Sequence, residues 1–310
     1  MLYLDKVRWL CYDCSNDALT QETIKVTEEK KMGKTVVIAG LGLMGGSMAM
    51  AFQEHTDWTV CGWNRTPAVA EKALAQGAID AIADWDTIAK CDLLIPVLYP
   101  AATVDFLKKV IPTMKPGAQI VDLVGVKTTV IDALEPLALA HGIHYTGGHP
   151  MAGKEVAGFD HAEAALYKGA SMILVPTQST AEGEIEELTD LFLRLGFGMV
   201  KVCDKYEHDR MIAHTSQLCH VVSNCYVKSP SSPNHKGFSA GSYRDMIRVA
   251  GVNEVLWTDL FLTNRDALLG ELDIFIGDLL KVRKALAEED EEEMQKLLRE
   301  GRLIREAIVD

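Results

Sequence analysis

Residues 35–47, with the sequence TVVIAGLGLMGGS, constrain the fold of this chain more than any other segment. A run of small and β-branched apolar residues ends in Gly40, Gly42 and Gly45, in the spacing G-x-G-x-x-G, and a helix-compatible stretch follows. In such a strand–turn–helix the first glycine allows the tight turn, the second lets a pyrophosphate approach the backbone, and the third lets helix and strand pack closely. The segment therefore predicts a dinucleotide-binding site, with a glycine-rich turn of some other α/β domain as the alternative.

The length and charge of the chain limit its class. Its 310 residues suffice for two domains of ordinary size. A formal net charge of −13 argues against general affinity for nucleic acid or an anionic membrane, so a local cluster of Lys and Arg must attract any anionic substrate. No apolar run reaches the roughly 18 residues of a membrane span. Seven scattered cysteines suit a reducing cytoplasm, and the C-x-x-C at Cys11 and Cys14 lacks the second pair that a zinc site needs, so we expect no metal.

The order of apolar and helical segments predicts three parts. Residues 1–33 show no clear period, and we expect them to form an extension outside the core. In residues 34–203 short apolar strands alternate with helical stretches, which is typical of a dinucleotide-binding sheet wound by helices. Residues 204–310 are almost entirely helical apart from the Ser-, Pro- and Gly-rich loop 229–242. The predicted fold class is α/β: an N-terminal Rossmann-type parallel sheet domain followed by an all-α dimerisation domain.

Two long helices are expected in the last part. Residues 205–228 read as one helix, and residues 256–287 as another whose Leu, Ile and Phe residues lie on more than one side. A helix this apolar is usually buried in a bundle or at a subunit contact, so we expect a homodimer formed through this domain. The acidic run 288–293 is interpreted as a solvated helix start, which the helix macrodipole favours.

The residues after the second strand bear on the choice of cofactor. In NAD-binding folds an acid roughly 20 residues past the glycines holds the ribose 2′-OH, but this chain has Asn64 there, followed by Arg65. Asn64 does not repel a 2′-phosphate and Arg65 can pair with one, so NADP is favoured over NAD; if Arg65 only stacks on the adenine, NAD stays usable. The candidate cofactor contacts are the turn residues, these two residues and one later lysine: Gly40, Gly42, Leu43, Met44, Gly45, Asn64, Arg65 and Lys127.

His149 is the candidate catalytic residue. It lies in GGHPMAGKEVAG, residues 147–158, where a strand of the sheet is expected to end, and ligands of such sheets bind beyond the strand carboxyl ends. Flanking glycines and Pro150 predict a stiff, exposed turn. A neutral imidazole, with a pKa of about 6.5, is the obvious base for a hydroxyl proton released as hydride leaves, although a lone histidine is more often structural. Six other histidines are interpreted as bystanders: His141, His144, His161, His208, His214 and His235.

The helix over 205–228 has a small, polar face, on which residues at spacings of three and four lie together: Ala213, Ser216, Gln217, His220 and Asn224. This face predicts the wall of a polar pocket, in which Ser216 and Gln217 are candidate substrate contacts; a satisfied hydrogen-bond network between helices is the alternative. Arg244 and Arg248 stand four apart on a later helix and could grip carboxylates with bidentate forks. Arg244 is the one more easily explained as a surface or structural cation.

Several segments, in order from about residue 35 to 270 or beyond, resemble the prephenate dehydrogenase family of tyrosine biosynthesis. They are GLGLMGG (40–46), DLVGVK (122–127), GGHPMAGKE (147–155), SQLCH (216–220) and YRDMIRVA (243–250), with Trp257 downstream. The GGHPMAGKE segment is highly specific, and the glycine turn alone is not.

The resemblance implies an oxidative decarboxylation. Prephenate gives hydride to the nicotinamide of NAD or NADP, its hydroxyl proton goes to His149, CO₂ leaves, and 4-hydroxyphenylpyruvate forms. The resemblance also implies that Arg248 binds a substrate carboxylate, that His220 contacts the substrate from the helical domain, and that Lys154 and Glu155 lie at the pocket rim.

The chain departs from the family pattern at two positions. Many members have a serine, hydrogen-bonded to the catalytic histidine, where this chain has Gly125, so His149 is expected to be oriented by water or a backbone group. Asn64 replaces the acid of NAD-using members. Because the sequence ends at Asp310, we expect no small C-terminal regulatory domain.

Three other functions compete with this interpretation. Arogenate dehydrogenase, whose substrate has an amino group in place of the keto group, is not separated from prephenate dehydrogenase by any residue, so dual specificity stays open. A β-hydroxyacid dehydrogenase would place a catalytic lysine on the long helix, and none lies between Lys205 and Lys228. A non-catalytic NADP sensor has no use for a base, so His149, His220 and Arg248 together argue against it.

Overall fold

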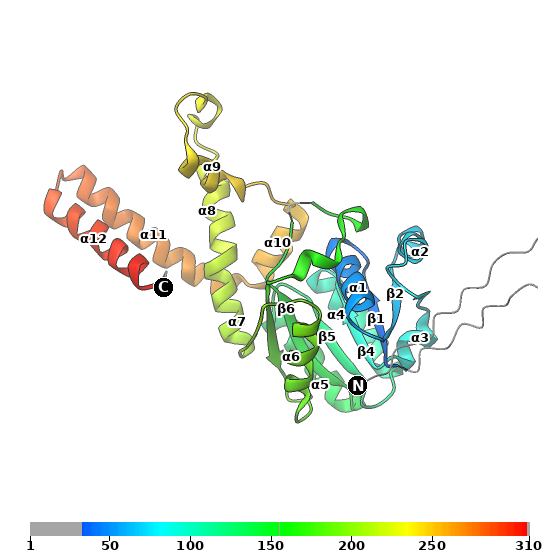
Figure 1. Ribbon diagram of the computed structural model, residues 1–310. Coiled ribbons are helices and arrows are strands. Elements are labelled where there is room, and N and C mark those ends of the chain that lie inside the picture. The colour runs from blue at the N-terminus through cyan, green and yellow to red at the C-terminus, as the bar shows by residue number, and fades with distance from the viewer. Residues whose placement is uncertain (1–32, 155, 309–310) are drawn as a thin grey trace, which may run out of the picture. The chain divides into compact units, whose positions relative to one another are not determined.

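The computed structural model describes residues 33–154 and 156–308. The expected extension, residues 1–33, falls outside this range except for Gly33, and so does Glu155. Within the described residues an α/β part precedes a helical part (Figure 1). No described helix combines the length and the apolar character that crossing a membrane requires.

The α/β part is built on one eight-stranded sheet in the order β3-β2-β1-β4-β5-β6-β7-β8. Every neighbouring pair is parallel except β6 and β7, so the sheet is mixed and mostly parallel. The strands are β1 (Thr35–Ala39), β2 (Thr59–Trp63), β3 (Ala81–Ile82), β4 (Leu93–Pro96), β5 (Gln119–Asp122), β6 (His144–Pro150), β7 (Ser171–Pro176) and β8 (Met199–Val202).

The antiparallel pairing of β6 and β7 is a local departure from the parallel pattern of the expected Rossmann-type sheet. A parallel neighbour requires a crossover that returns the chain to the opposite edge. Here residues 151–170 contain only the short 3-10 helices η2 (Phe159–His161) and η3 (Ala164–Tyr167), and Pro150 is in register with Met172. The connection therefore stays at the carboxyl edge of the sheet, where it packs on the helix that follows β1.

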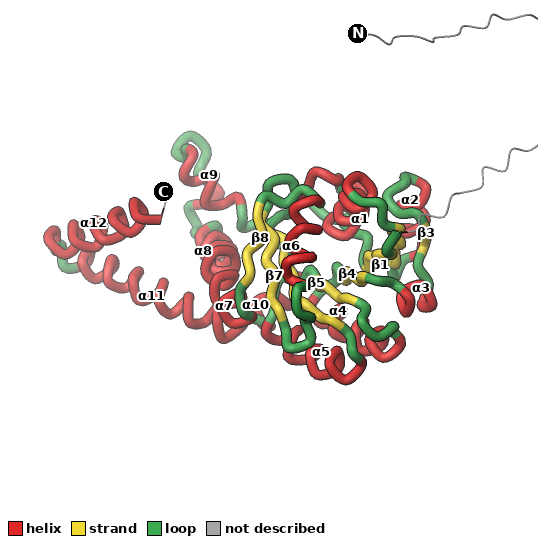
Figure 2. The backbone as a smooth tube through the Cα atoms, turned by 60° about the horizontal axis from the view of Figure 1, so that its bottom comes forward, coloured by secondary structure: helices red, strands yellow, loops and turns green. Residues whose placement is uncertain are grey.

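Helices cover both faces of the sheet (Figure 2). They are α1 (Leu43–His55), α2 (Pro67–Ala75), α3 (Trp85–Lys90), α4 (Pro100–Val110), α5 (Thr128–His141) and α6 (Glu184–Arg194). Side chains alternate along β1: Val36 and Ile38 join one core with α1 and α6, and Val37 and Ala39 join the other with α4 and α5.

The helical part begins with the expected run at 205, but the run is not a uniform α-helix. It consists of α7 (Lys205–Ile212), a π-helical turn η4 (Ala213–Gln217) and α8 (Leu218–Tyr226). A second expected helix, 256–287, is divided at Asn264 into α10 (Glu254–Thr263) and α11 (Arg265–Ala287). Asn264 between them has a non-helical backbone (φ −103°, ψ 28°), and its side-chain amide donates to the Asp209 carbonyl and to Gln217 Oε1, at 2.9 and 2.8 Å.

Large apolar side chains are exposed on α11 and on α12 (Glu291–Ile308), which returns alongside it (Figure 1). The exposed residues include Ile274, Ile276, Leu279, Leu280, Leu286, Leu298 and Ile304. The small core of the helical part, around Ala213, Leu218 and Leu268, does not cover them. Contiguous apolar surface of this kind marks a protein–protein contact. The second half of the acidic run 288–293 forms the first turn of α12, in which Glu291, Glu292 and Glu293 lie, and Glu288 caps the end of α11.

Candidate active site

The three glycines of the turn between β1 and α1 differ in what an added Cβ atom would meet. Gly40 has φ +103°, and a Cβ there would lie 2.4 Å from the Val97 carbonyl oxygen. A Cβ on Gly45 would lie 1.8 Å from the Gly40 carbonyl oxygen, so only glycine lets α1 pack on the turn. A Cβ on Gly42, at the N-cap of α1, would meet no protein atom within 4 Å. Gly42 is thus open toward a ligand at the positive end of the helix, as a pyrophosphate site requires.

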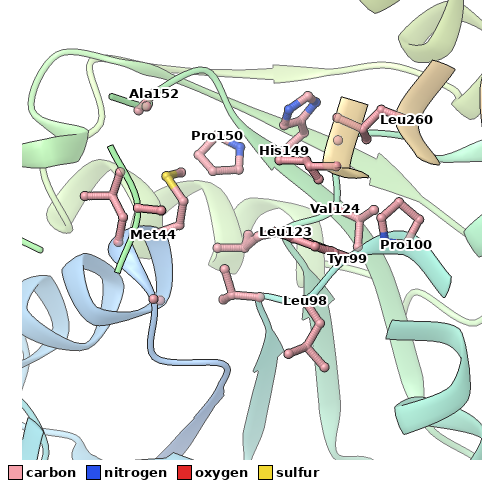
Figure 3. A pocket seen from close by; sticks show the side chains of 18 of the residues that line it. Met44, Leu98, Tyr99, Pro100, Leu123, Val124, His149, Pro150, Ala152 and Leu260 are labelled. Atoms are coloured by element: carbon pink, nitrogen blue, oxygen red, sulfur yellow. The ribbon is translucent and has the colours of Figure 1, made fainter. Parts of the chain in front are cut away.

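The glycine turn and His149 line the same cavity, of about 560 Å³ (Figure 3). Its walls come from segments at the carboxyl edge of the sheet and from the helical part: residues 42–45, 97–100, 123–125, 149–150, 152–154, 156–158, Ile212, Ser216, Gln217, Leu256, Trp257 and Leu260. Of the candidate cofactor contacts, Gly42, Leu43, Met44 and Gly45 line it. The cavity therefore lies where open α/β sheets bind their ligands.

His149 is half-buried near the end of β6, and not on an exposed turn as expected. Antiparallel pairing with β7 sets His149 opposite Ile173 and extends the strand to Pro150. A side chain on a paired strand is held more rigidly than one on a turn. Burial, then the nearby His208 and Lys127, hold the pKa of His149 well below its usual range, so the imidazole is neutral at neutral pH.

His208, which was interpreted as a bystander, is the hydrogen-bond partner of His149. The Nδ1 atom of His149 lies 2.9 Å from Nε2 of His208, and Nδ1 of His208 lies 2.7 Å from Oδ1 of Asp209. His208 and Asp209 are both buried. Burial lowers the pKa of His208 despite the hydrogen bond to Asp209. Burial acts to raise the pKa of Asp209, but the hydrogen bonds from His208 and Thr128 outweigh it and lower that pKa.

Gly125 lies beside the other ring nitrogen of His149. A Cβ at this position would be 3.7 Å from Nε2 of His149 and 3.3 Å from Cδ2 of Leu260. The ring is oriented instead from its Nδ1 side, by the His208 side chain, which corrects the expectation of water or a backbone group. Sequence reasoning missed His208 although it precedes Ile212 and Ser216, both cavity residues, by four and eight positions.

Lys127 was predicted to contact the cofactor, and the structure places it in the interior. Its side chain is completely buried, and Nζ donates to Oδ1 of Asp122 at 2.6 Å and to the Val124 carbonyl at 2.7 Å. The same aspartate accepts from the hydroxyl of Tyr145 at 2.8 Å. The Lys127 ammonium points into this network and does not line the cavity. Its effect on the site is electrostatic, because its positive charge lowers the pKa of His149.

Asn64 and Arg65 follow β2 as the cofactor prediction requires. Oδ1 of Asn64 accepts from the Leu41 N–H at 3.0 Å, and its Nδ2 donates to the Thr66 carbonyl at 3.1 Å. Asn64 thereby ties the end of β2 to the glycine turn. Arg65 is exposed beside it. Neither side chain lines the cavity described above, whose lining includes His149 and the turn residues 42–45.

The π-helical turn η4 presents Ser216 and Gln217 to the cavity. Such turns inside α-helices are frequent at functional sites. Gln217 is nonetheless buried, and its amide donates to the Leu260 carbonyl at 3.3 Å and accepts from Asn264. For Gln217 the alternative, a hydrogen-bond network between helices, is therefore present. Asn224 likewise donates to the Ala250 carbonyl at 3.4 Å.

The remaining predicted substrate contacts are only partly brought together. Lys154 lines the cavity and pairs with Glu163 at 2.7 Å. His220 is outside the cavity lining; its Nδ1 is 2.7 Å from the Val249 carbonyl oxygen, and its ring centroid is 3.8 Å from that of Trp257, a cavity residue. Arg248 is exposed at the end of α9 (Gly241–Arg248) and outside the cavity lining. Glu155 lies outside the described residues.

The chain matches two described domains in succession. Residues 48–201 match the nucleotide-binding domain of prephenate dehydrogenase, and residues 204–300 match its dimerization domain. The second match accords with the exposed apolar residues of α11 and α12 and suggests a homodimer.

Individual proteins agree with these domain matches. A cyclohexadienyl dehydrogenase of Zymomonas mobilis is 32% identical over 89% of this chain and 96% of its own length. The solved arogenate dehydrogenase of Synechocystis covers 89% of this chain and all of its own, with 26% identity and a TM-score of 0.76. Prephenate dehydrogenase from A. aeolicus, solved with hydroxyphenyl propionate and NAD+, covers 89% of this chain and 98% of its own, with 25% identity and a TM-score of 0.79. The chain therefore belongs to the prephenate dehydrogenase family of NAD(P)-dependent oxidoreductases.

Proposed function

We propose that this chain oxidatively decarboxylates prephenate to 4-hydroxyphenylpyruvate in tyrosine biosynthesis. The observation that carries the proposal is that a neutral imidazole and an anion-binding helix start line one cavity. A hydride transfer needs this juxtaposition, because the base must reach the hydroxyl of the carbon that loses hydride while the nicotinamide lies against the same carbon. Membership of the family supports the same reaction.

When bound, NAD(P)+ supplies the hydride acceptor. Residues of this chain bind the cofactor and accept the proton. The N-terminus of α1 and the open backbone at Gly42 hold the pyrophosphate, and His149 takes the hydroxyl proton at Nε2. Loss of hydride and proton leaves a ketone in the ring, and CO₂ then departs as the ring becomes aromatic. Leu256, Trp257 and Leu260 give the cavity an apolar wall against which a six-membered ring can pack.

The cofactor that we favour is NADP. No acid follows β2, and Arg65 stands exposed beside Asn64, so a guanidinium is available to a 2′-phosphate. Arg65→Ala should lower kcat/KM with NADP by roughly 10- to 100-fold, since a charge-assisted contact is worth roughly 1.5–3 kcal/mol, and should change it little with NAD. A wild-type enzyme with a clear preference for NAD would refute this choice.

Arg248 and His220 stay proposed substrate contacts. Because Arg248 lies outside the cavity lining of a single chain, the proposal requires that α9 of the same chain, or of a partner in the homodimer, approaches the cavity when substrate binds. Arg248→Ala should mainly raise KM, because it removes binding that ground state and transition state share. A lowered kcat with unchanged KM would assign Arg248 another role.

The test of the proposed function is the appearance of reduced nicotinamide with prephenate, measured by absorbance with each cofactor. His149→Asn keeps a polar side chain but removes the basic ring nitrogen, and it should lower kcat by roughly 10²- to 10⁴-fold, which is the usual contribution of a general base, with a much smaller change in KM. Wild-type kcat in this variant would contradict the role of His149. No turnover of prephenate by the wild type would contradict the substrate.

Arogenate is the second candidate substrate, and dual specificity the third. The observation in their favour is that relatives covering nearly the same length carry the names cyclohexadienyl dehydrogenase and arogenate dehydrogenase. The two substrates differ in a side-chain keto or amino group away from the carbon that loses hydride. The ratio of kcat/KM for prephenate and arogenate, measured side by side, decides among the three.

A further inference from the structure

The carboxylate of Asp209 fixes the proton positions along the chain His149–His208–Asp209. A charged carboxylate only accepts, so Nδ1 of His208 carries a proton and donates to Oδ1 of Asp209. Neutral His208 then has a lone pair at Nε2, and this lone pair accepts from Nδ1–H of His149 at 2.9 Å. The proton of neutral His149 is therefore on Nδ1. Its Nε2, beside the side-chain-free Gly125, keeps the lone pair that a base needs.

An imidazolium confined to His149 is unfavourable in this setting. The ring contacts His208 of α7, burial disfavours its charged form, and the buried ammonium of Lys127 repels a second positive charge. His208, one hydrogen bond away, has a carboxylate 2.7 Å from its far nitrogen. Of the two rings, His208 is the better place for the positive charge.

Building on the proposed function, we propose that His208, held by Asp209, is the positioning residue that orients His149 and receives the positive charge when His149 takes the substrate's hydroxyl proton. In this step the substrate O–H bond breaks and an Nε2–H bond forms on His149. The Nδ1–H bond of His149 breaks as an Nε2–H bond forms on His208. The carbinol C–H bond breaks, and its electron pair leaves as hydride to the oxidised nicotinamide.

After the step His149 is neutral again, with its proton on Nε2, and imidazolium His208 is paired with the Asp209 carboxylate. Loss of CO₂ then leaves a negative charge on the ring oxygen, and Nε2–H of His149 returns its proton to that oxygen. The proton on Nε2 of His208 then returns to Nδ1 of His149, which restores the starting tautomers. The cycle releases no net proton, because the hydroxyl proton that His149 takes up returns to the phenol oxygen of the product.

Asp209 is held firmly enough for this role. Its Oδ1 also accepts from the Lys127 N–H and its Oδ2 from the Thr128 N–H, both at 2.8 Å, at the start of α5. These bonds keep the carboxylate charged although it is buried. The other charged groups that act on His208 are Lys127, which opposes a positive charge there, and Asp122, which favours it.

His208→Gln tests the proposal. A glutamine amide can donate to Asp209 and accept from Nδ1–H of His149, so it reproduces the neutral ring but cannot take up a proton. We expect KM values and cofactor affinity near those of the wild type and a kcat lower by roughly 10- to 100-fold. The acid limb of the kcat–pH profile should move to lower pH, because in the wild type the pair binds its first proton on His208, and the variant lacks this site. A wild-type kcat and pH profile in this variant would overturn the proposal.

His214→Gln is the matched control. His214 lies on the same helical run, is exposed, and contacts Glu271 at 2.9 Å, away from the cavity lining. It should keep the wild-type kcat and pH profile. In Asp209→Asn the side chain loses the negative charge that favours an imidazolium at His208, so its kcat should also fall below that of the wild type.

A readout that needs no turnover separates this proposal from the proposed substrate. The ¹⁵N NMR spectrum of histidine-labelled wild-type protein with bound NADP should show His149 and His208 both protonated at Nδ1 and unprotonated at Nε2 near pH 7.5. A proton on Nε2 of His149 would overturn the proposal. Should neither prephenate nor arogenate be turned over, the substrate assignment fails, and the tautomers still decide the role of His208.

Discussion

Replacement of Gly42 by alanine should weaken cofactor binding without destabilising the fold. Gly42 has φ −80° and ψ −157°, which alanine adopts without strain, and an added Cβ would meet no protein atom within 4 Å. The free energy of unfolding should therefore stay within about 0.5 kcal/mol of the wild type. A pyrophosphate that approaches the backbone here would collide with the new methyl group.

The size of the effect on binding follows from the hydrogen bond that the methyl group would prevent. A backbone N–H that donates to a charged phosphate contributes about 1.5–3 kcal/mol. Since 1.4 kcal/mol corresponds to a tenfold change in Kd, Gly42→Ala should weaken NADP binding by roughly 10- to 100-fold. Titration of the protein with NADP by calorimetry measures Kd, and thermal denaturation without cofactor measures stability.

Gly45→Ala is the contrasting variant. Its Cβ would lie 1.8 Å from the Gly40 carbonyl oxygen, about 1.6 Å short of the 3.4 Å of ordinary contact. Overpacking against backbone costs roughly 1–3 kcal/mol or more, so the Tm of this variant should fall by several degrees in addition to the loss of binding. Gly42→Ala with unchanged Kd, or with as large a loss of Tm as Gly45→Ala, would refute the assignment of Gly42 to the cofactor.

Two further predictions concern the buried charges. Folding lowers the pKa values of His149 and His208. In the unfolded chain these histidines have a pKa of about 6.5, so below that pH the unfolded chain binds more protons than the folded chain. The free energy of unfolding should therefore be highest above pH 6.5 and fall by up to ~1.4 kcal/mol per pH unit for each ring as the pH drops below that value. Urea unfolding at pH 7.5 and 5.5 measures this slope, which His208→Gln should make shallower. Lys127→Met leaves Asp122 charged and buried and should cost about 3–5 kcal/mol in the same assay, whereas a loss below 1 kcal/mol would contradict the buried ion pair.

The α/β architecture could be predicted from the sequence because the features that indicate it are local. The strand–glycine–helix segment and the alternation of apolar strands with helices are contained in short windows. The direction of β7 was missed because it depends on the connection 151–170, whose 3-10 helices carry no period of their own. The break at Asn264 was missed for a similar reason: the side chain of Asn264 hydrogen-bonds to groups on α7 and η4, which are far away in the sequence.

The candidate site was predictable where motifs are contiguous, and less so where partners come from distant segments. Gly42 and His149 stand in dense motifs, and they line one cavity. His208 has no motif around it, and its role depends on a contact with a residue 59 positions earlier. Lys127 lies within a motif, but whether its ammonium points to a ligand or to Asp122 is decided by buried packing that the sequence does not display.

The same carboxylate that sets the tautomers also joins the two parts of the chain. Asp209 belongs to α7, at the start of the helical part, and it accepts the first N–H groups of α5, which belongs to the sheet part. His149 comes from β6 and His208 from α7, so the base exists in its working form only when α7 is docked against α5. A substrate that binds between the two parts therefore meets a base whose protonation state already depends on their correct apposition. This dependence explains why a buried and otherwise costly aspartate belongs at this junction and not on the cavity wall.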